Sequence, residues 1–140
     1  MVQAVERQSQ SSMSKLVYIL AGGALGASMR YGISLLVFRV AGGSFPWGTL
    51  IVNVLGSFLA GFAWAYLNQS SGPERINALF IIGMMGAFTT FSAYALESLR
   101  LFESGSINLA LGNVLANNSG ALLAAFAGFT LARWLFPQVV

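Results

Sequence analysis

"GMMGAFTTFS", residues 83–92, lies at the centre of an uncharged, largely apolar run from Ile76 to Leu96. A run of about 20 apolar residues is long enough to cross a bilayer as a helix. This centre does not suit a regular lipid-facing helix, because glycine loosens the backbone and threonine and serine compete for its hydrogen bonds. Irregular backbone at membrane depth is tolerated where protein or a water-filled path covers it. The stretch therefore predicts a transmembrane helix broken at its centre, with the break as the working site. The alternative is an ordinary helix whose small residues serve packing.

The composition indicates an integral membrane protein. Of the 140 residues, 56% are hydrophobic and 8% are charged, whereas soluble domains average about 25% charged residues. The sequence has no cysteine, histidine or aspartate, which excludes disulfides and most metal and general-base sites. Its basic residues are scattered rather than clustered, which argues against nucleic acid as a partner.

Four apolar segments follow a polar tail. Residues 1–14 are rich in serine and glutamine and lack the apolar core and cleavage site of a signal peptide, so we expect a disordered tail. Residues 15–137 predict an all-α transmembrane domain. Its four expected spans cover residues 16–38, 49–67, 76–102 and 107–136.

Small residues recur at helical spacing in two of these spans. Gly22 and Gly26 form a Gly-x-x-x-Gly pair in the first span, and Gly112, Ala116 and Gly120 form a similar face in the last. The Gly-x-x-x-Gly pair lets two helices approach closely in a membrane.

The few polar side chains within the spans are candidate functional residues. Arg30 would either snorkel to the headgroups or act electrostatically at a pore mouth. Asn53 in the second span would either join two helices or line a polar path. Asn113 and Asn117 share one face of the last span, with the same two alternatives. Glu97 is an acidic residue toward the end of the third span.

The basic residues do not favour one orientation in the membrane. Four of the seven are expected on the side of the membrane where the N-terminus lies, and three on the opposite side. The clear excess that the positive-inside rule requires is therefore missing. The two groups are Arg7, Lys15, Arg75 and Arg133, and Arg30, Arg39 and Arg100. Such a chain could insert both ways up and pair antiparallel. Because four short helices enclose little on their own, we expect a homo-oligomer.

Three motifs occur in order along the chain. They are Gly22-Gly23-x-x-Gly26-Ala27-x-x-Arg30-Tyr31, Phe45-Pro46-x-Gly48-Thr49-Leu50-x-Val52-Asn53-x-x-Gly56-Ser57-Phe58 and Gly83-x-x-Gly86-x-x-Thr89-Thr90-Phe91-Ser92. Together they resemble the small bacterial fluoride channels of the Fluc/CrcB type. The resemblance implies a passive, fluoride-selective channel of the bacterial inner membrane that exports fluoride and protects the cell from it. It also implies an antiparallel, dual-topology homodimer with two pores and a structural sodium ion at the dimer interface.

The resemblance assigns roles to individual residues. Asn53 matches the family's pore-lining asparagine, and Phe91 matches the first of two aromatic residues whose ring edges line the ion path. The second aromatic residue is usually phenylalanine and is Tyr94 here, which adds a hydroxyl. Gly86 and Thr89 match the positions at the break whose backbone carbonyls hold the sodium ion. The other residues expected at the site are Thr90, Ser92 and Asn117 in the fluoride path, and Arg30 and Glu97 in a vestibule or structural role.

These residue types suit the chemistry of fluoride. Whatever removes the ion's water must replace the lost hydrogen bonds, and neutral donors such as Asn53 and Ser92 do so without the fixed positive charge that would hold the ion too tightly. Aromatic rings have electron-poor edges that can face an anion.

Three other classes of protein fit less well. A small proton-coupled multidrug exporter also uses four helices and antiparallel dimers, but needs a carboxylate in its first helix, whereas Glu97 lies on the third. An intramembrane serine protease needs a histidine or lysine base, and the only lysine, Lys15, precedes the first span. A purely structural bundle would have an unbroken third helix.

Overall fold

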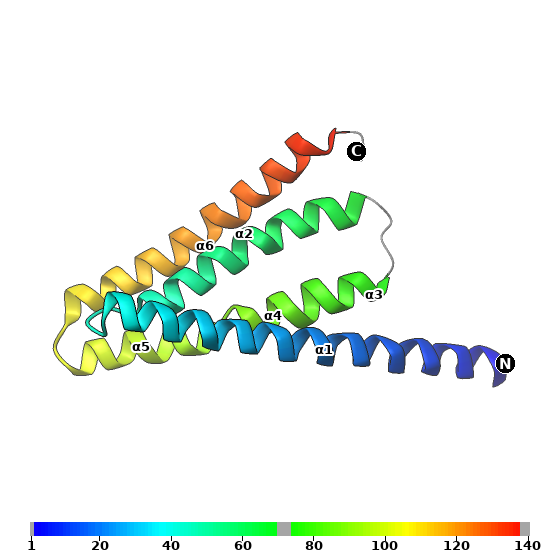
Figure 1. The fold of residues 1–140 in the computed structure, drawn as a ribbon, viewed down its shortest axis with the longest axis horizontal. Coiled ribbons are helices and arrows are strands. Elements are labelled where there is room, and N and C mark those ends of the chain that lie inside the picture. Colours follow the sequence, from blue (N-terminus) through cyan, green and yellow to red (C-terminus); the bar gives the residue numbers. More distant parts are fainter. Residues whose placement is uncertain (1, 70–73, 138–140) are drawn as a thin grey trace.

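Every regular element of the described chain is helical. The computed structural model describes residues 2–69 and 74–137, with side chains over residues 12–67 and 74–137. The elements are α1 (Val2–Ala41), α2 (Trp47–Gln69), α3 (Glu74–Asn77), the π-helical segment η1 (Ala78–Met85), α4 (Gly86–Phe88), α5 (Phe91–Glu103) and α6 (Ile107–Leu135) (Figure 1).

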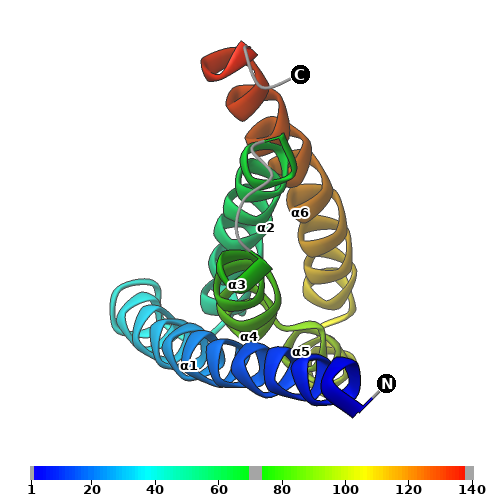
Figure 2. The same cartoon turned by 90° about the vertical axis from the view of Figure 1, so that its right-hand side faces the viewer.

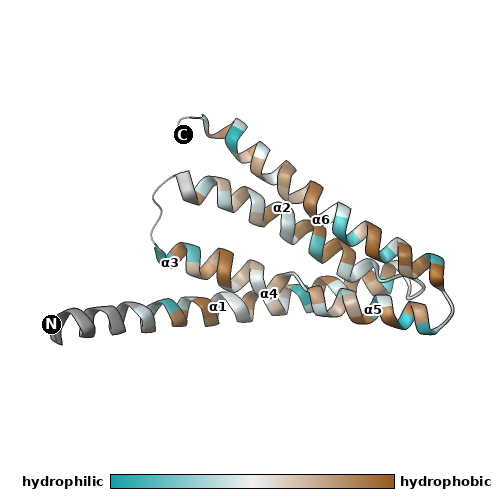
Figure 3. Cartoon of the chain, turned by 180° about the vertical axis from the view of Figure 1, so that it is seen from behind, coloured by the Kyte–Doolittle hydropathy of each residue, from teal (hydrophilic) through white to brown (hydrophobic). Residues whose placement is uncertain are grey.

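Four stretches are long and apolar enough to cross a membrane, which confirms the predicted all-α chain with four spans. They are Ser12–Ala41, Trp47–Leu67, Glu74–Glu103 and Ile107–Leu135. Large apolar side chains cover their outside: Leu122 and Phe126 on α6 are 74% and 70% exposed. Brown, hydrophobic residues accordingly run along the helices in Figure 3. Such an outer surface is suited to lipid rather than water.

The N-terminal segment differs from the expectation. The sequence predicts a disordered tail over residues 1–14, whereas the structure continues α1 through residues 2–14. That segment contains no glycine or proline, so no residue in it ends the helix. Residue 1 and the loop at 70–73 lie outside the described residues.

The helices form two closely packed pairs. α2 runs along α6, and α1 crosses η1 and α4 (Figures 1 and 2). A Cβ atom added at Gly22 or Gly26 would collide with the carbonyl oxygen of Leu79 or Met84. The Gly-x-x-x-Gly pair of the first span therefore brings α1 against the backbone of the third, as its spacing predicts.

The second small-residue face makes no close backbone contact within the described chain. A Cβ at Gly112 would meet no atom within 4 Å, and one at Gly120 would meet only a methyl group of Val54. The close approach of α2 to α6 occurs instead at Gly61 and Gly128, where a Cβ would collide with backbone carbonyls. Spacing alone does not show which residues of a helix face a neighbour, because that depends on where the two helices cross.

The third span, Glu74–Glu103, changes its backbone geometry at Thr89 and Thr90. α4 ends at Phe88, Thr89 has φ −76° and ψ 156°, and Thr90 has φ −149° and ψ 114°, both extended conformations. α5 then begins at Phe91, and its third amide, that of Ala93, donates to Thr90 Oγ1 at 3.2 Å. Thr90 is thus the N-cap of α5.

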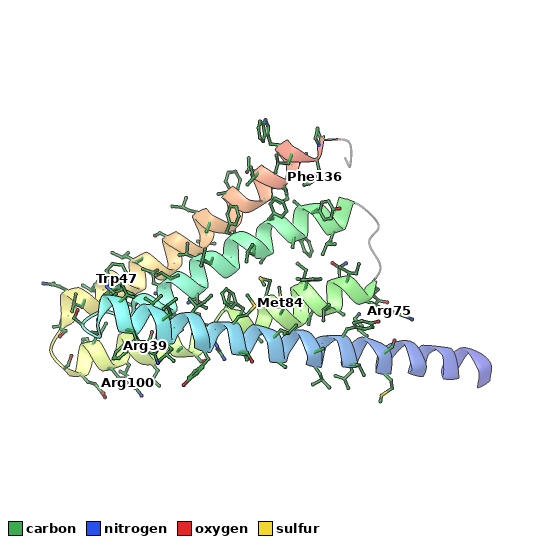
Figure 4. The ribbon with its side chains drawn as sticks, viewed as in Figure 1. Arg39, Trp47, Arg75, Met84, Arg100 and Phe136 are labelled. Carbon is green, nitrogen blue, oxygen red and sulfur yellow. The ribbon has the colours of Figure 1, made fainter. Side chains whose placement is uncertain are left out.

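Charged residues lie near the two ends of the bundle. Arg39, Arg100 and Trp47 gather at the end where α5 meets the α5–α6 turn, and Arg75 and Phe136 lie toward the other end (Figure 4). These positions fit residues that sit at the membrane–water interface.

Candidate functional site

A groove with a volume of about 300 Å³ opens beside the extended Thr89–Thr90 segment, between α2, α5 and α6. All of its lining residues are uncharged. Six of the residues expected at the site line it: Asn53, Thr89, Thr90, Phe91, Tyr94 and Asn117. The structure therefore brings together residues from three of the four spans.

Asn53 holds the extended segment in place. Its side-chain Oδ1 accepts a hydrogen bond from the Thr90 N–H at 2.8 Å, and its Nδ2 donates to the Thr90 carbonyl at 3.1 Å. The amide thus pairs with the Thr90 backbone as a neighbouring strand would. Asn53 is 8% exposed, and buried polar groups of this kind need such partners.

A directional chain of hydrogen bonds continues from Asn53 into α6. Asn53 Nδ2 donates to Asn117 Oδ1 at 2.9 Å, and Asn117 Nδ2 donates to Asn113 Oδ1 at 2.8 Å. Asn113 Nδ2 donates to Ser98 Oγ at 2.8 Å, and Ser98 donates to the Tyr94 carbonyl at 2.8 Å. Each group accepts from one side and donates to the other, an arrangement in which hydrogen bonds reinforce one another.

These bonds bear on the two alternatives for Asn53. Both hydrogens of its Nδ2 group are used, one on Thr90 and one on Asn117. The same residue lines the groove. Asn53 therefore joins α2 to the third and fourth spans while bordering a polar space, so the two alternatives do not exclude each other.

Two aromatic residues, Phe91 and Tyr94, line the groove. The centroids of Phe91 and Tyr94 are 5.2 Å apart with the rings inclined at 72°, an edge-to-face pair. Phe91 is 76% exposed and Tyr94 is 9% exposed. The Tyr94 hydroxyl accepts a hydrogen bond of 2.9 Å from Asn118 Nδ2. Ser92 is exposed and does not line the groove, but its Oγ lies 3.3 Å from Thr90 Oγ1.

The carbonyls of Gly86 and Thr89 lose the partners that a continuous helix would supply. Those partners would be the N–H groups of Thr90 and Ala93, which instead donate to Asn53 Oδ1 and Thr90 Oγ1. In the described part of the chain, no other backbone donor replaces them. A Cβ at Gly86 would have no neighbour nearer than 3.9 Å. Carbonyl oxygens without helical partners are ligands suited to a hard cation.

Glu97 belongs to a second cavity, of about 500 Å³, toward the end of the bundle that carries Arg100. Its Oε1 accepts a hydrogen bond from Thr49 Oγ1 at 2.7 Å. Its Oε2 is buried, and no partner for it is found among the residues whose side chains are described. Arg30 is half-buried and lines neither this cavity nor the groove.

The sequence analysis missed two contacts of the site. Ser98 closes the chain of amides, and Thr49 binds Glu97. Ser98 lies one helical turn after Tyr94, on the face of α5 that meets the asparagines of α6. That i, i+4 spacing is the signal that could have identified it.

A four-span chain with an uncharged, donor-lined groove at membrane depth defines a small multi-pass membrane protein with a polar pathway site. The family model described as "CrcB-like protein, Camphor Resistance (CrcB)" matches residues 17–129. The chain therefore belongs to the CrcB-like family, which consists of ion channels and not enzymes.

Several relatives carry the name "Fluoride-specific ion channel FluC". The chain is 43% identical to the one from Magnetococcus marinus over 120 residues, which cover 85% of this chain and 98% of the relative. It is 40% identical to the one from Parabacteroides distasonis over 127 residues, covering 91% and 99%. The corresponding values for Hahella chejuensis are 44% over 123 residues, covering 87% and 97%.

Proposed function

We propose that this chain is a fluoride-selective passive channel that exports fluoride across a bacterial inner membrane and so protects the cell from it. Two findings support the proposal. Relatives of the same family, matched over 98% and 99% of their length, carry the name of a fluoride-specific channel, and the groove is lined by neutral polar, aromatic and aliphatic side chains, none of them charged. The groove is the observation on which the proposal depends, because conduction requires contacts favourable enough to admit an ion and weak enough to release it.

We further propose that the channel is an antiparallel homodimer of dual topology with two pores. A single chain leaves the Phe91 ring 76% exposed and the groove open to one side. A second copy would cover this side and complete the wall of a narrow path. The nearly even distribution of basic residues between the two sides of the spans supports both orientations in one membrane.

The divided third span takes two roles in this proposal. Its extended residues would place the Phe91 ring edge and the Thr90 and Ser92 hydroxyls along the ion path. The carbonyls of Gly86 and Thr89, which lack helical partners, would hold the structural sodium ion at the dimer interface. A bound cation would supply a fixed positive field near both pores, which favours anions over cations. Glu97 and Arg30 remain candidates for the vestibule.

Ion release from liposomes tests the proposal. The purified protein is reconstituted, and fluoride and chloride electrodes record efflux at neutral pH without a proton gradient. Fast release of fluoride with little chloride is the expected result. No fluoride release from a folded, dimeric protein would contradict the channel function and direct attention to Glu97 and the proton-coupled multidrug exporter.

The aromatic wall has its own test. Phe91→Ile keeps an apolar side chain but removes the ring edge, so we expect fluoride release to fall by at least about tenfold while the protein remains folded. Leu122→Ile, at another residue that lines the same groove, removes no ring and serves as the matched comparison. Near-normal release by Phe91→Ile would show that the ring edge is not needed at this position.

A further inference from the structure

The Tyr94 hydroxyl is a polar group that the proposed fluoride path does not account for. Tyr94 occupies the position at which the fluoride channels that this chain resembles usually have phenylalanine, so the hydroxyl is a feature of this chain. Both Tyr94 and its hydrogen-bond partner Asn118 line the groove. The ring itself is 9% exposed and packs edge-to-face with Phe91, so its position is fixed.

The contacts of Asn118 determine the direction of its bond to Tyr94. One atom of the Asn118 amide lies 2.7 Å from the Val114 carbonyl oxygen, which can only accept, so this atom is the nitrogen Nδ2. The same nitrogen lies 2.9 Å from the Tyr94 hydroxyl. The phenol oxygen therefore accepts from Asn118, and the phenol hydrogen is not used in that bond.

The phenol hydrogen has no acceptor in the part of the chain whose side chains are described. Within residues 12–67 and 74–137, whose side chains are described, Asn118 is the only polar partner of the Tyr94 hydroxyl. A hydroxyl that accepts from an amide is also a better donor, because hydrogen bonds in a chain polarise one another. In contrast, both hydrogens of the Asn53 Nδ2 group are already used.

We propose that the Tyr94 hydroxyl donates a hydrogen bond to the permeating anion, and that Asn118 is the positioning residue that keeps it a donor. This inference rests on the proposed function and names one further contact in the same path. The ligand class is a small anion of high charge density, because such an ion gains most from a short, directed O–H donor. As a neutral group, the phenol strips water from the ion without trapping it.

Four proteins test the pair: wild type, Tyr94→Phe, Asn118→Leu and the double variant. Fluoride release from liposomes is recorded over a series of fluoride concentrations, so that the half-saturating concentration is obtained separately from the maximal rate. We expect Tyr94→Phe to raise the half-saturating concentration about tenfold, the size of effect typical for losing one hydrogen bond to a charged group. Tyr31→Phe, which removes an exposed phenol outside the groove, should leave it unchanged.

The double variant separates positioning from packing. Asn118→Leu alone should raise the half-saturating concentration because the phenol loses its orienting donor, but it should add nothing in the Tyr94→Phe background. Asn118→Asp keeps the shape of the side chain and can only accept, so it takes up the phenol hydrogen and should impair fluoride release at least as much as Tyr94→Phe.

The outcomes distinguish this inference from the function on which it rests. A wild-type protein that releases no fluoride overturns both. A conducting wild type whose Tyr94→Phe variant stays within about twofold of it overturns the role of the hydroxyl alone. An equal effect of Asn118→Leu with and without the Tyr94 hydroxyl overturns the positioning role of Asn118.

Discussion

The two halves of the third span are held in the bundle by different forces. The first half, Glu74–Phe88, lies against α1, where Gly22, Gly26 and Gly83 let backbone meet backbone. The second half, α5, meets α6 through hydrogen bonds such as that from Asn113 to Ser98. Lipid tails are as apolar as the helices, so association in a membrane depends on close packing and on polar contacts. In this chain, close packing holds the part of the span before Thr89–Thr90, and polar contacts hold the part after it.

The comparison shows what the extended segment does for the fold. A straight helix would keep one partner along its whole length. The extended Thr89–Thr90 segment lets the span leave α1 and join α6, and Asn53 supplies the hydrogen bonds that the segment loses from the helix. The irregular backbone is thus satisfied by a neighbouring helix, as the absence of water at that depth requires.

The largest effect is expected from Asn53→Asp, which removes hydrogen bonds that hold the extended segment between the two halves. The carboxylate can still accept from the Thr90 N–H, but it cannot donate to the Thr90 carbonyl or to Asn117, and it places a negative charge beside two acceptors. We expect fluoride release to fall by roughly a hundredfold or more, because buried groups are left unpaired and an anion meets an anion. Liposome efflux with the fluoride electrode measures this.

A control variant distinguishes the effect of changing Asn53 from the effect of adding one negative charge to the protein. Asn108→Asp makes the same chemical change on an exposed position near the start of α6, and it should conduct like wild type. If Asn53→Asp also conducted normally, the amide would be dispensable and the extended segment would be held by its other neighbours.

The sequence predicted the parts of this arrangement that depend on local pattern. Four spans follow from the lengths of the apolar runs, and four of the six expected residues that line the groove belong to the quoted motifs. The close approach at Gly22 and Gly26 follows from their spacing within one helix.

The remaining features depend on contacts between segments distant in the sequence. The role of Ser98 and the direction of each hydrogen bond in the asparagine chain require knowing which face of α5 meets α6. The close contact of α2 with α6 at Gly61 and Gly128 was not predicted for the same reason, since only the crossing geometry decides it. The homodimer and the sodium ion stay predictions, because they concern partners that one chain does not include.

An intermediate effect is expected from Gly26→Ala, which tests the glycine-packed half. The added methyl group would collide with the Met84 carbonyl oxygen, and because that atom is backbone, α1 and η1 must move apart. We expect the free energy of unfolding in detergent to fall by about 1–3 kcal/mol, the usual cost of overpacking. Gly23→Ala is the matched control, since a Cβ there meets no atom within 4 Å. Equal stability of the two variants would show that α1 and η1 can separate without cost.

The smallest effect is expected from Gly112→Ala on α6, the helix that meets the second half of the third span through amide side chains. Gly112 adjoins Asn113, yet a Cβ at Gly112 meets no atom within 4 Å, so the contact of α6 with α5 does not depend on a small residue there. Alanine also loses less conformational freedom than glycine when it enters a helix. We therefore expect the free energy of unfolding to stay the same or to rise by up to about 1 kcal/mol, measured beside Gly26→Ala in the same detergent. A loss as large as that of Gly26→Ala would mean that another helix covers Gly112 in the folded protein. Since no helix of the described chain does so, that helix would belong to a second copy, and the polar half would then share the close packing that distinguishes the first.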